Sequence, residues 1–440
     1  MKAYRTGKIQ TVAILGGGPA ACTLAVLLQR RGIRTAIFHL PKRAPLLVGE
    51  SLVPAIIPLL QLLGVEDEVR AYSTFKPGAT FNIREPENYS FYFHQLIGTT
   101  RYSYNTPRDQ FDDTLLNAAR KAGAKIIEAA AGVEKIPGTD RVRLSADTLA
   151  AAGDFFADGA PVSDPASLNT TSRVGDRRST QPDLIVDATG RVRLLSNLLK
   201  IPSTEGRRKD TALFAHVDQT LLDHEGHVHS TLLDHGWSWR IPLPGRVSLG
   251  IVIGSEHLPK FGATKEERYD NLLKQDSVLA RVAKDSRRLT PVMEYTNYQL
   301  VSQRMQGDGW VLVGDSAGFI DPVFSSGLFI GMFGATLLAE AIEKGTPQAF
   351  SAYEKEITHH LETWHEIVDY FYNGRLFTFF RAGEELRDNW FIKLSMPHVA
   401  KHLGRIFSGA ASTSSYSLGL LRFGMKYCLR DADPKETAVR

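Results

Sequence analysis

The sequence predicts an α/β protein: a Rossmann-type dinucleotide-binding domain, an interwoven antiparallel sheet that forms a second domain, and a helical C-terminal region. Three observations lead to this fold class. An apolar strand at 11–15 enters a glycine-rich turn and a helix, residues 210–305 carry alternating patterns, and beyond residue 345 apolar residues recur at intervals of three and four. Alternation with period two indicates strands, and a period of 3.6 indicates helices.

Bulk properties are those of an ordinary globular chain. The 440 residues are 43% apolar and 23% charged, and 52 basic side chains nearly cancel 48 acidic ones. This balance predicts no nucleic-acid or anionic membrane partner. Cys22 and Cys428 lie far apart and outside any metal-binding pattern, so neither a disulfide scaffold nor a zinc site is expected. No stretch approaches the ~20 apolar residues of a membrane span, and no signal peptide is recognisable. We therefore expect a cytoplasmic protein.

Residues 11–38 form one strand–helix–strand pattern. The strand Thr11–Leu15 runs into Gly16-Gly17-Gly18-Pro19, a helical pattern covers 20–31, Gly32 ends that helix, and a second strand covers 35–38. Strand, glycine turn, helix and strand within about 30 residues make up the βαβ nucleotide-binding unit.

Gly16, Gly18 and Ala21 give this turn the form G-x-G-x-x-A. The first glycine permits the tight turn, the second lets the backbone approach a pyrophosphate, and the small third residue lets helix pack on strand. The phosphates then lie at the helix N-terminus, and Pro19 is assigned with the glycines to this cofactor site. The alternative is a glycine turn that binds nothing. The second strand of such units normally ends in a carboxylate that binds the adenosine ribose; here His39 holds that place, and a neutral imidazole can accept one hydrogen bond.

The other elements follow in order along the chain. A helix is predicted at 111–122, and an antiparallel layer at 133–193 is interrupted by a polar surface insertion at 150–182 that we expect to be mobile. We predict strands at 125–130, 184–188, 248–253 and 310–313, a helix at 328–342, and a frayed tail over the last ten residues.

One helical face stands out in the C-terminal region. It consists of Tyr353, Ile357, Leu361, Trp364, Val368 and Phe371. A face packed on the core is the expected role, and a lid over a hydrophobic ligand is the alternative.

Further motifs resemble those of glutathione-reductase-type FAD proteins of the aromatic hydroxylase class. Arg108 lies in an R-x-x-F-D segment, Asp187 begins an Asp-Ala-Thr-Gly element, and Asp315 lies in VLVGDSAGFIDP. The resemblance spans about residues 10–340. It implies FAD as the bound nucleotide, with Arg108 near the flavin and Asp315 on its ribityl chain. It also implies an FAD-binding domain over 1–200 and 300–345, a substrate-facing sheet domain over 201–299 and a helical region over 346–440.

Within that class the chain resembles the flavin-dependent halogenases of phenol and pyrrole type. The segment from Trp237 through Trp239 to Pro242 matches W-x-W-x-I-P at every fixed position, and the segment from Phe319 through Pro322 to Gly327 matches F-x-x-P-x-x-S-x-G completely. Lys76 lies where that family places its active-site lysine. The Gly49-Glu50-Ser51 turn, followed by Pro54, resembles the segment beside the isoalloxazine, and Pro322 and Ser51 are therefore assigned to the cofactor site.

This resemblance implies a halogenation mechanism. Reduced flavin (FADH2), O2 and chloride or bromide yield hypohalous acid, and backbone amides of Ser326 and Gly327 bind the halide. Trp237 and Trp239 separate the flavin from an electron-rich aromatic substrate, free or held on a carrier protein. Lys76 captures the oxidant as a chloramine or holds it by a hydrogen bond. With no second dinucleotide fingerprint, a separate flavin reductase is the expected source of FADH2.

Each assignment has an alternative. The two tryptophans alternate onto one strand face, which also suits a plain hydrophobic patch. Lys76 beside a Pro-Gly turn also fits a solvated surface lysine, and 325–327 also fits a helix N-cap without halide. For the whole chain, the alternatives are an FAD monooxygenase or geranylgeranyl-reductase-like oxidoreductase without halogenation, and a non-catalytic FAD binder.

Overall fold

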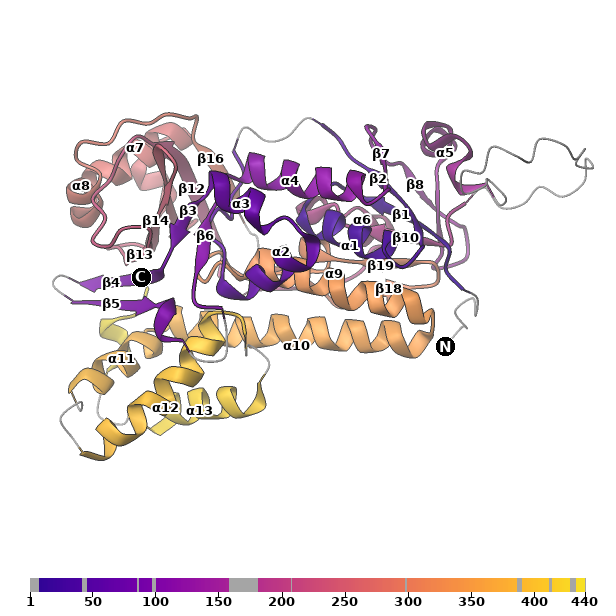
Figure 1. Cartoon of the computed structure of the whole chain (residues 1–440). Helices are drawn as coiled ribbons and strands as arrows, with labels where there is room; N and C mark the ends of the chain where they lie inside the picture. The colour runs from indigo at the N-terminus through magenta and orange to yellow at the C-terminus, as the bar shows by residue number, and fades with distance from the viewer. Residues whose placement is uncertain are drawn as a thin grey trace, which may run out of the picture.

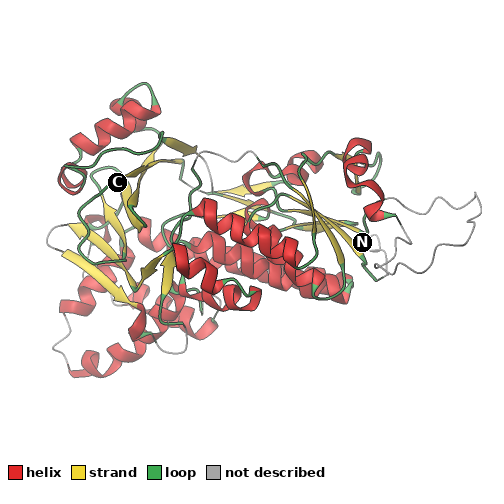
Figure 2. Cartoon of the chain, turned by 45° about the horizontal axis from the view of Figure 1, so that its top comes forward, coloured by secondary structure: helices red, strands yellow, loops and turns green. Residues whose placement is uncertain are grey.

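The computed structural model describes residues 8–41, 46–84, 87–96, 100–157, 181–206, 208–296, 299–385, 390–410, 414–427 and 433–439. Most of the predicted insertion, 158–180, lies outside these residues. Its described N-terminal part is ordered, because 150–156 lies in helix α5 (Ala146–Ala152) and the 3₁₀ turn η3 (Gly153–Phe156). In Figure 2 the two large sheets stand toward opposite ends of the molecule and long helices run between them.

The predicted α/β class is confirmed, beginning with a six-stranded sheet in the order β18-β19-β10-β1-β2-β7. All its neighbouring strands are parallel except the edge pair β18 and β19. The central strands β1 and β10 are fully buried because both faces of the sheet are covered. The six strands are β1 (Thr11–Leu15), β2 (Arg34–Phe38), β7 (Lys125–Ile127), β10 (Leu184–Asp187), β18 (Gln306–Gly307) and β19 (Trp310–Leu312).

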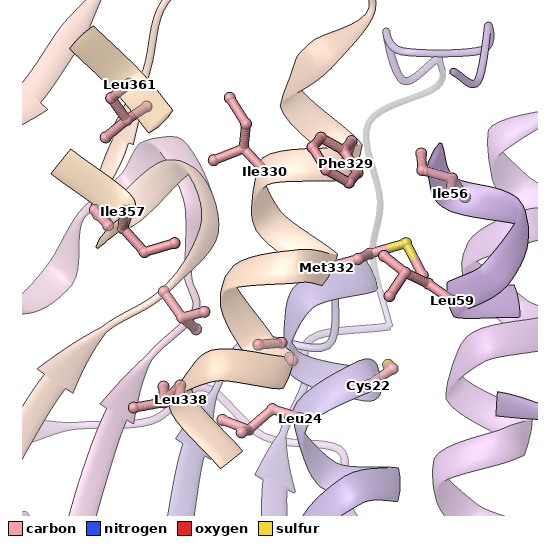
Figure 3. Packing of buried hydrophobic residues seen from close by; sticks show 14 of the residues in the cluster. Cys22, Leu24, Ile56, Leu59, Phe329, Ile330, Met332, Leu338, Ile357 and Leu361 are labelled. Carbon is pink, nitrogen blue, oxygen red and sulfur yellow. The ribbon is translucent and has the colours of Figure 1, made fainter. Parts of the chain in front are cut away.

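Helices α1 (Pro19–Gln29), α4 (Arg108–Lys121), α9 (Ser326–Lys344) and α10 (Pro347–Tyr372) pack beside this sheet. In Figure 1 α9 and α10 run side by side, and α9 also packs on α1. Figure 3 shows side chains of these helices meeting, among them Leu24 of α1, Leu338 of α9 and Ile357 of α10. Within the described residues α9 is the one helix long and apolar enough to cross a membrane, yet it packs here as a core helix.

The second large sheet has seven strands in the order β16-β12-β15-β14-β13-β4-β5, antiparallel except for β13 and β4. Its strands are β4 (Gly78–Arg84), β5 (Glu87–Tyr92), β12 (Asp210–Val217), β13 (Val228–Leu232), β14 (Trp237–Leu243), β15 (Arg246–Gly254) and β16 (Met293–Thr296). Thus β4 and β5 join this sheet although their residues precede 201, where the sequence begins the sheet domain. One face joins the main core, and the other packs on α7 (Lys265–Gln275) and α8 (Ser277–Val282).

The antiparallel layer expected over 133–193 is smaller than predicted. Among the described residues of this region, only the hairpin of β8 (Val133–Lys135) and β9 (Val142–Leu144) is antiparallel, because the fully buried β10 joins the parallel sheet instead. The remaining strands are β3 (Thr74–Lys76), β6 (Ser103–Asn105), β11 (Ser203–Glu205), β17 (Leu300–Ser302) and β20 (Gly318–Phe319). The pair β3-β6 and the order β11-β17-β20 make two further small sheets.

The described part of the C-terminal region is mainly helical. The six side chains of the predicted helical face are buried in the main core, so this face is packed against other side chains. The final described segment is not frayed: Thr437 Oγ1 donates to Gly374 O at 2.8 Å and Val439 N to Tyr372 O at 3.0 Å. The other α-helices are α2 (Ile57–Leu63), α3 (Glu66–Tyr72), α6 (Leu194–Leu199), α11 (Arg375–Glu385), α12 (Trp390–Phe407) and α13 (Ser415–Tyr427). Short 3₁₀ turns are η1 (Pro54–Ile56), η2 (Phe93–Gln95), η4 (Gly190–Val192), η5 (Leu258–Phe261), η6 (Gly314–Ser316) and η7 (Pro434–Glu436).

Candidate functional site

A cavity of about 330 Å³ lies where the two large sheets meet. Its walls come from the segments that follow the parallel strands β1, β10 and β19, from residues 47–51, and from the apolar faces of β13 and β14. Ligands of open α/β sheets bind at the carboxyl ends of the parallel strands, so the position is the expected one. Of the predicted site residues, ten line it: Gly16, Gly18, Pro19, Ser51, Arg108, Trp237, Trp239, Asp315, Pro322 and Gly327.

The glycine turn forms one end of this cavity. Gly16 has φ +104°, and a Cβ there would lie 2.4 Å from Ala188 O, so only glycine fits. Gly18 precedes α1 as its N-cap, and a Cβ there would meet nothing within 4 Å, which leaves open space in front of the helix N-terminus. Backbone amides and the helix dipole favour an anionic phosphate in such a place. His39 follows β2 and lies beside the turn, since a Cβ on Gly17 would come 2.5 Å from its Nδ1.

Ala21, the third small residue of the motif, is buried in α1, outside the cavity lining. The Asp187 carboxylate binds nearby backbone amides. It accepts hydrogen bonds from Thr189 N at 2.9 Å and from Leu195 N at 2.7 Å. Its part in the predicted motif is therefore to hold the turn whose residues Ala188–Gly190 line the cavity.

Arg108 lies at the first position of α4 and crosses to the 47–51 segment. Its Nε donates to Asp112 Oδ1 at 3.0 Å, and its Nη1 donates to Val48 O. Although burial opposes it, the Asp112 carboxylate raises the pKa of Arg108. Burial also raises the pKa of Asp315, and the nearby Arg108 charge partly offsets this. The cavity lining thus contains a guanidinium and a carboxylate from segments far apart in the sequence.

Trp237 and Trp239 form a wall of the cavity. Both lie on β14 and face the main core, with ring centroids 5.8 Å apart. Trp239 fits because Gly250 on β15 lacks a side chain: a Cβ there would come 2.1 Å from the indole. Its Nε1 donates to Ser248 Oγ at 3.3 Å. The pair therefore lines the cavity and is also part of the buried sheet face.

The Trp237 indole is fixed by a buried chain of hydrogen bonds. Its Nε1 donates to Tyr372 Oη at 3.0 Å, and that hydroxyl donates to Asp321 Oδ2 at 3.0 Å. Gln299 Nε2 donates to the same carboxylate oxygen at 3.2 Å. Burial raises the pKa of Asp321 to about 7, and the negative charge of Asp210 adds to this effect.

Lys76 is buried with 2% exposure, so its interpretation as a solvated surface lysine is wrong. It lies at the end of β3, and its Nζ donates to Ser51 Oγ at 2.7 Å and to Leu52 O at 2.8 Å. Ser51 lines the cavity, and Lys76 stands directly behind it. Burial lowers the pKa of Lys76 to about 7. A large fraction of the amine is therefore neutral and nucleophilic near neutral pH.

The N-terminus of α9 opens onto the same cavity. Ser325 is its N-cap with φ +56°, and its side chain makes no capping hydrogen bond. Gly327 lines the cavity, and a Cβ there would come 2.7 Å from the Phe319 ring. Ser326 is buried beside it with 3% exposure. The first backbone amides of a 19-residue helix thus lie at the cavity wall, where an anion is stabilised.

Sequence reasoning missed several polar groups at this site. Glu50 lines the cavity and its Oε1 lies 2.7 Å from His216 Nε2. Asp321 lay inside a recognised motif and could have been singled out there. Tyr372 and His216 carried no local signal, because each reaches the site from more than 100 residues away in sequence.

Comparisons with known proteins agree with this geometry. A family model described as tryptophan halogenase matches residues 166–384, and one described as FAD binding domain matches 9–143. A tryptophan 2-halogenase from Chondromyces crocatus is 29% identical over 391 residues, covering 85% of this chain and 70% of that protein. A 1H-pyrrole-2-carbonyl-(peptidyl-carrier protein) chlorinase from Pseudomonas fluorescens is 26% identical, covering 84% of this chain and 85% of that protein. The solved structure of a flavoprotein/dehydrogenase from Cytophaga hutchinsonii superimposes with a TM-score of 0.76 at 22% identity, covering 95% of this chain and 97% of that one.

Proposed function

Because the chain belongs to the flavin-dependent halogenase family and binds FAD, we propose that it halogenates an electron-rich aromatic compound of phenol or pyrrole type, using O2 and chloride or bromide. Hypohalous acid is relayed to Lys76. The observation that carries this proposal is the buried amine of Lys76, held 2.7 Å from Ser51 at the cavity wall with its pKa lowered to about 7. A structural lysine would gain nothing from such burial, whereas a neutral amine is the form that reacts with an electrophilic halogen.

The cavity fits FAD. Gly16, Gly18 and the N-terminus of α1 offer backbone amides and open space for a pyrophosphate, with Pro19 at the helix start. His39 stands where the adenosine ribose is expected. Arg108, Asp315, Pro322 and Ser51 would hold the rest of the molecule. When bound in reduced form, FAD supplies with O2 the oxidising equivalent that turns halide into hypohalous acid.

The protein then has to bind halide and keep the organic substrate off the flavin. Backbone amides at Ser326 and Gly327 supply partial positive charge without a titrating group, which suits a weakly hydrated anion. Trp237 and Trp239 fill the cavity wall, and hydrogen bonds fix both indoles. Only a small oxidant, and not an aromatic ring, would pass between this wall and Ser51.

Lys76 completes the transfer. Its neutral amine attacks hypohalous acid, an N–halogen bond forms, and water leaves. The halogen then passes as an electrophile to a ring carbon, the carbon–hydrogen bond breaks, and the proton restores the amine. Atoms and charge balance without a further oxidant. Retention of the oxidant by a hydrogen bond to Nζ would use the same residue and the same ring position.

This proposal also concerns the source of FADH2 and the form in which the substrate arrives. FADH2 would come from a separate flavin reductase, in the cytoplasm. The substrate is either a free aromatic compound or one tethered to a carrier protein, as the name of the Pseudomonas fluorescens chlorinase indicates for that protein. The alternative, an FAD oxidoreductase without halogenation, is favoured by the likeness of the whole fold to a flavoprotein/dehydrogenase.

Mass spectrometry of a pooled library of electron-rich aromatics tests the proposal. Purified protein receives FAD, a flavin reductase, NADH, O2 and bromide, with a parallel reaction without halide. We expect bromide-dependent isotope doublets in the wild type, none with Lys76→Ala, and wild-type product levels with the exposed-lysine control Lys135→Ala. Lys76→Ala should still bind FAD and consume NADH. Loss of FAD by that variant would remove the proposed role, and halide-independent gain of one oxygen would favour the monooxygenase.

A further inference from the structure

Three chain segments converge beside Lys76. Two glycines allow this close approach: a Cβ on Gly226 would lie 2.3 Å from the backbone oxygen of Phe75, and a Cβ on Gly78 would lie 2.6 Å from the side-chain Nε2 of His227. Asn105 on β6 joins them, because its Nδ2 donates to Gly226 O at 2.9 Å. The imidazole of His227 therefore lies against Gly78, two residues after Lys76.

These segments present unsatisfied hydrogen-bonding atoms. His227 Nε2, Asn105 Oδ1 and Ser103 Oγ are buried and have no hydrogen-bond partner among the described residues. The three residues are at most 1% exposed, and Ser103 faces Lys76 in the β3–β6 ladder. A buried polar atom without a partner carries a desolvation penalty, and an unoccupied ligand site is one reason why such atoms persist.

The unpaired atom of Asn105 is an acceptor, and the role of His227 Nε2 follows from the tautomer of its ring. Asn105 uses its Nδ2 as a donor, so its Oδ1 is the free acceptor. Burial, and after it the neighbouring His224 and Lys76 charges, lowers the pKa of His227 to about 4, so the ring is neutral in ordinary buffers. With its Nδ1 2.9 Å from Thr80 Oγ1, a ring that donates to Thr80 leaves Nε2 as an acceptor. In that tautomer both atoms require a donor.

We propose that His227 Nε2 and Asn105 Oδ1 form an acceptor pair that binds a ring O–H or N–H of the substrate beside Lys76. This inference rests on the proposed halogenation. It limits the substrate class to aromatics with a hydrogen-bond donor on the ring, namely phenols and N-unsubstituted pyrroles. An accepted hydrogen bond also increases electron density on the ring, which favours attack on the electrophilic halogen. The Phe93 ring, whose centroid lies 5.4 Å from Lys76 Nζ, supplies an apolar surface for the aromatic ring. Because the pair is closed to solvent here, binding also requires local opening.

Matched substrates that differ by one methyl group test the pair. Binding of 2,4-dichlorophenol and of 2,4-dichloroanisole to the FAD-loaded full chain is measured by calorimetry, and bromination of 3-methoxyphenol and of 1,3-dimethoxybenzene is measured as kcat/KM. Leaving a buried acceptor unpaired disfavours the methyl ether roughly 10- to 100-fold. We expect that preference in the wild type, near loss of it in His227→Phe, and its rescue in His227→Gln, whose side-chain oxygen can still accept.

His224→Phe is the matched control, since this neighbouring ring lies 5.0 Å from His227 and its Nδ1 already contacts Tyr92 Oη. It should keep the wild-type preference. Equal binding of phenol and methyl ether by the wild type overturns the inference, as does an unchanged preference in His227→Phe. Preferential phenol binding without any bromide-dependent product supports the acceptor pair and counts instead against halogenation as the activity.

Discussion

Replacing Lys76 by methionine should stabilise the protein, and by an amount that depends on pH. Burial lowers the pKa of this amine to about 7 from its ordinary value of 10.5. Between those values the unfolded chain binds one proton more than the folded protein, so wild-type stability rises by about 1.4 kcal/mol per pH unit. Below pH 7 both states are protonated and the cost of burying the charge is complete, at about 5 kcal/mol. Methionine has similar length and no charge, so it removes this dependence.

Urea unfolding followed by tryptophan fluorescence, with saturating FAD, checks this expectation at two pH values. The gain in unfolding free energy of Lys76→Met over the wild type should be about 2.5 kcal/mol larger at pH 7.5 than at pH 9.5. Lys135→Met, at an exposed strand residue, should show no such difference. A gain that is equal at both pH values would mean that Lys76 keeps its charge when folded. The neutral amine on which the proposed relay depends would then be absent.

The other predictions concern the cofactor turn and the tryptophan wall. Gly18→Val should lose FAD but keep the wild-type unfolding temperature, because a Cβ there meets nothing within 4 Å. Gly16→Val should lose FAD and also unfold at a lower temperature, because the φ of Gly16 is +104°. Flavin absorbance and a melting curve separate the two outcomes. Tyr372→Phe removes the acceptor of the Trp237 indole and should cost about 1–3 kcal/mol, with more hydrogen peroxide released per halogenated product; an unchanged product-to-peroxide ratio would contradict a role in the wall. Asp321 has a pKa raised to about 7 by burial, so it releases its proton more readily when unfolded and wild-type stability falls as pH rises from about 4 to 7. Between pH 5 and pH 7 this contributes a fall of about 2 kcal/mol, which Asp321→Asn should lack in urea titrations at those two pH values.

Local chemistry explains why the sequence predicted the fold class and the cofactor. The turn at 16–21 needs glycine for its own backbone geometry, and the structure shows that need directly at Gly16. The alternation along 237–239 places both indoles on one face of β14 whatever that face packs against. Features of this kind depend on residues only a few positions away, so they can be predicted from the sequence alone.

The pairing of strands that are far apart in the sequence could not be predicted in this way. The 133–193 region alternates enough to suggest an antiparallel layer, but burial on both faces puts β10 in the parallel sheet. Strand β4 pairs in parallel with β13, about 150 residues later, and nothing local in the sequence indicates this pairing. Packing of whole elements, which optimises total burial, decides such pairings.

The sequence by itself therefore predicted the FAD-binding fold, with its glycine turn between strand and helix, and placed two tryptophans on one strand face. Only the tertiary structure showed that Lys76 is buried and that its pKa is lowered. Lys76 is buried between segments that are far apart in the sequence. It bonds to Ser51, which lies 25 positions before it, and it lies near His227, which lies 151 positions after it. The physical reason is that a pKa depends on the dielectric and the charges around a group in space. Those surroundings exist only after the two sheets have packed together.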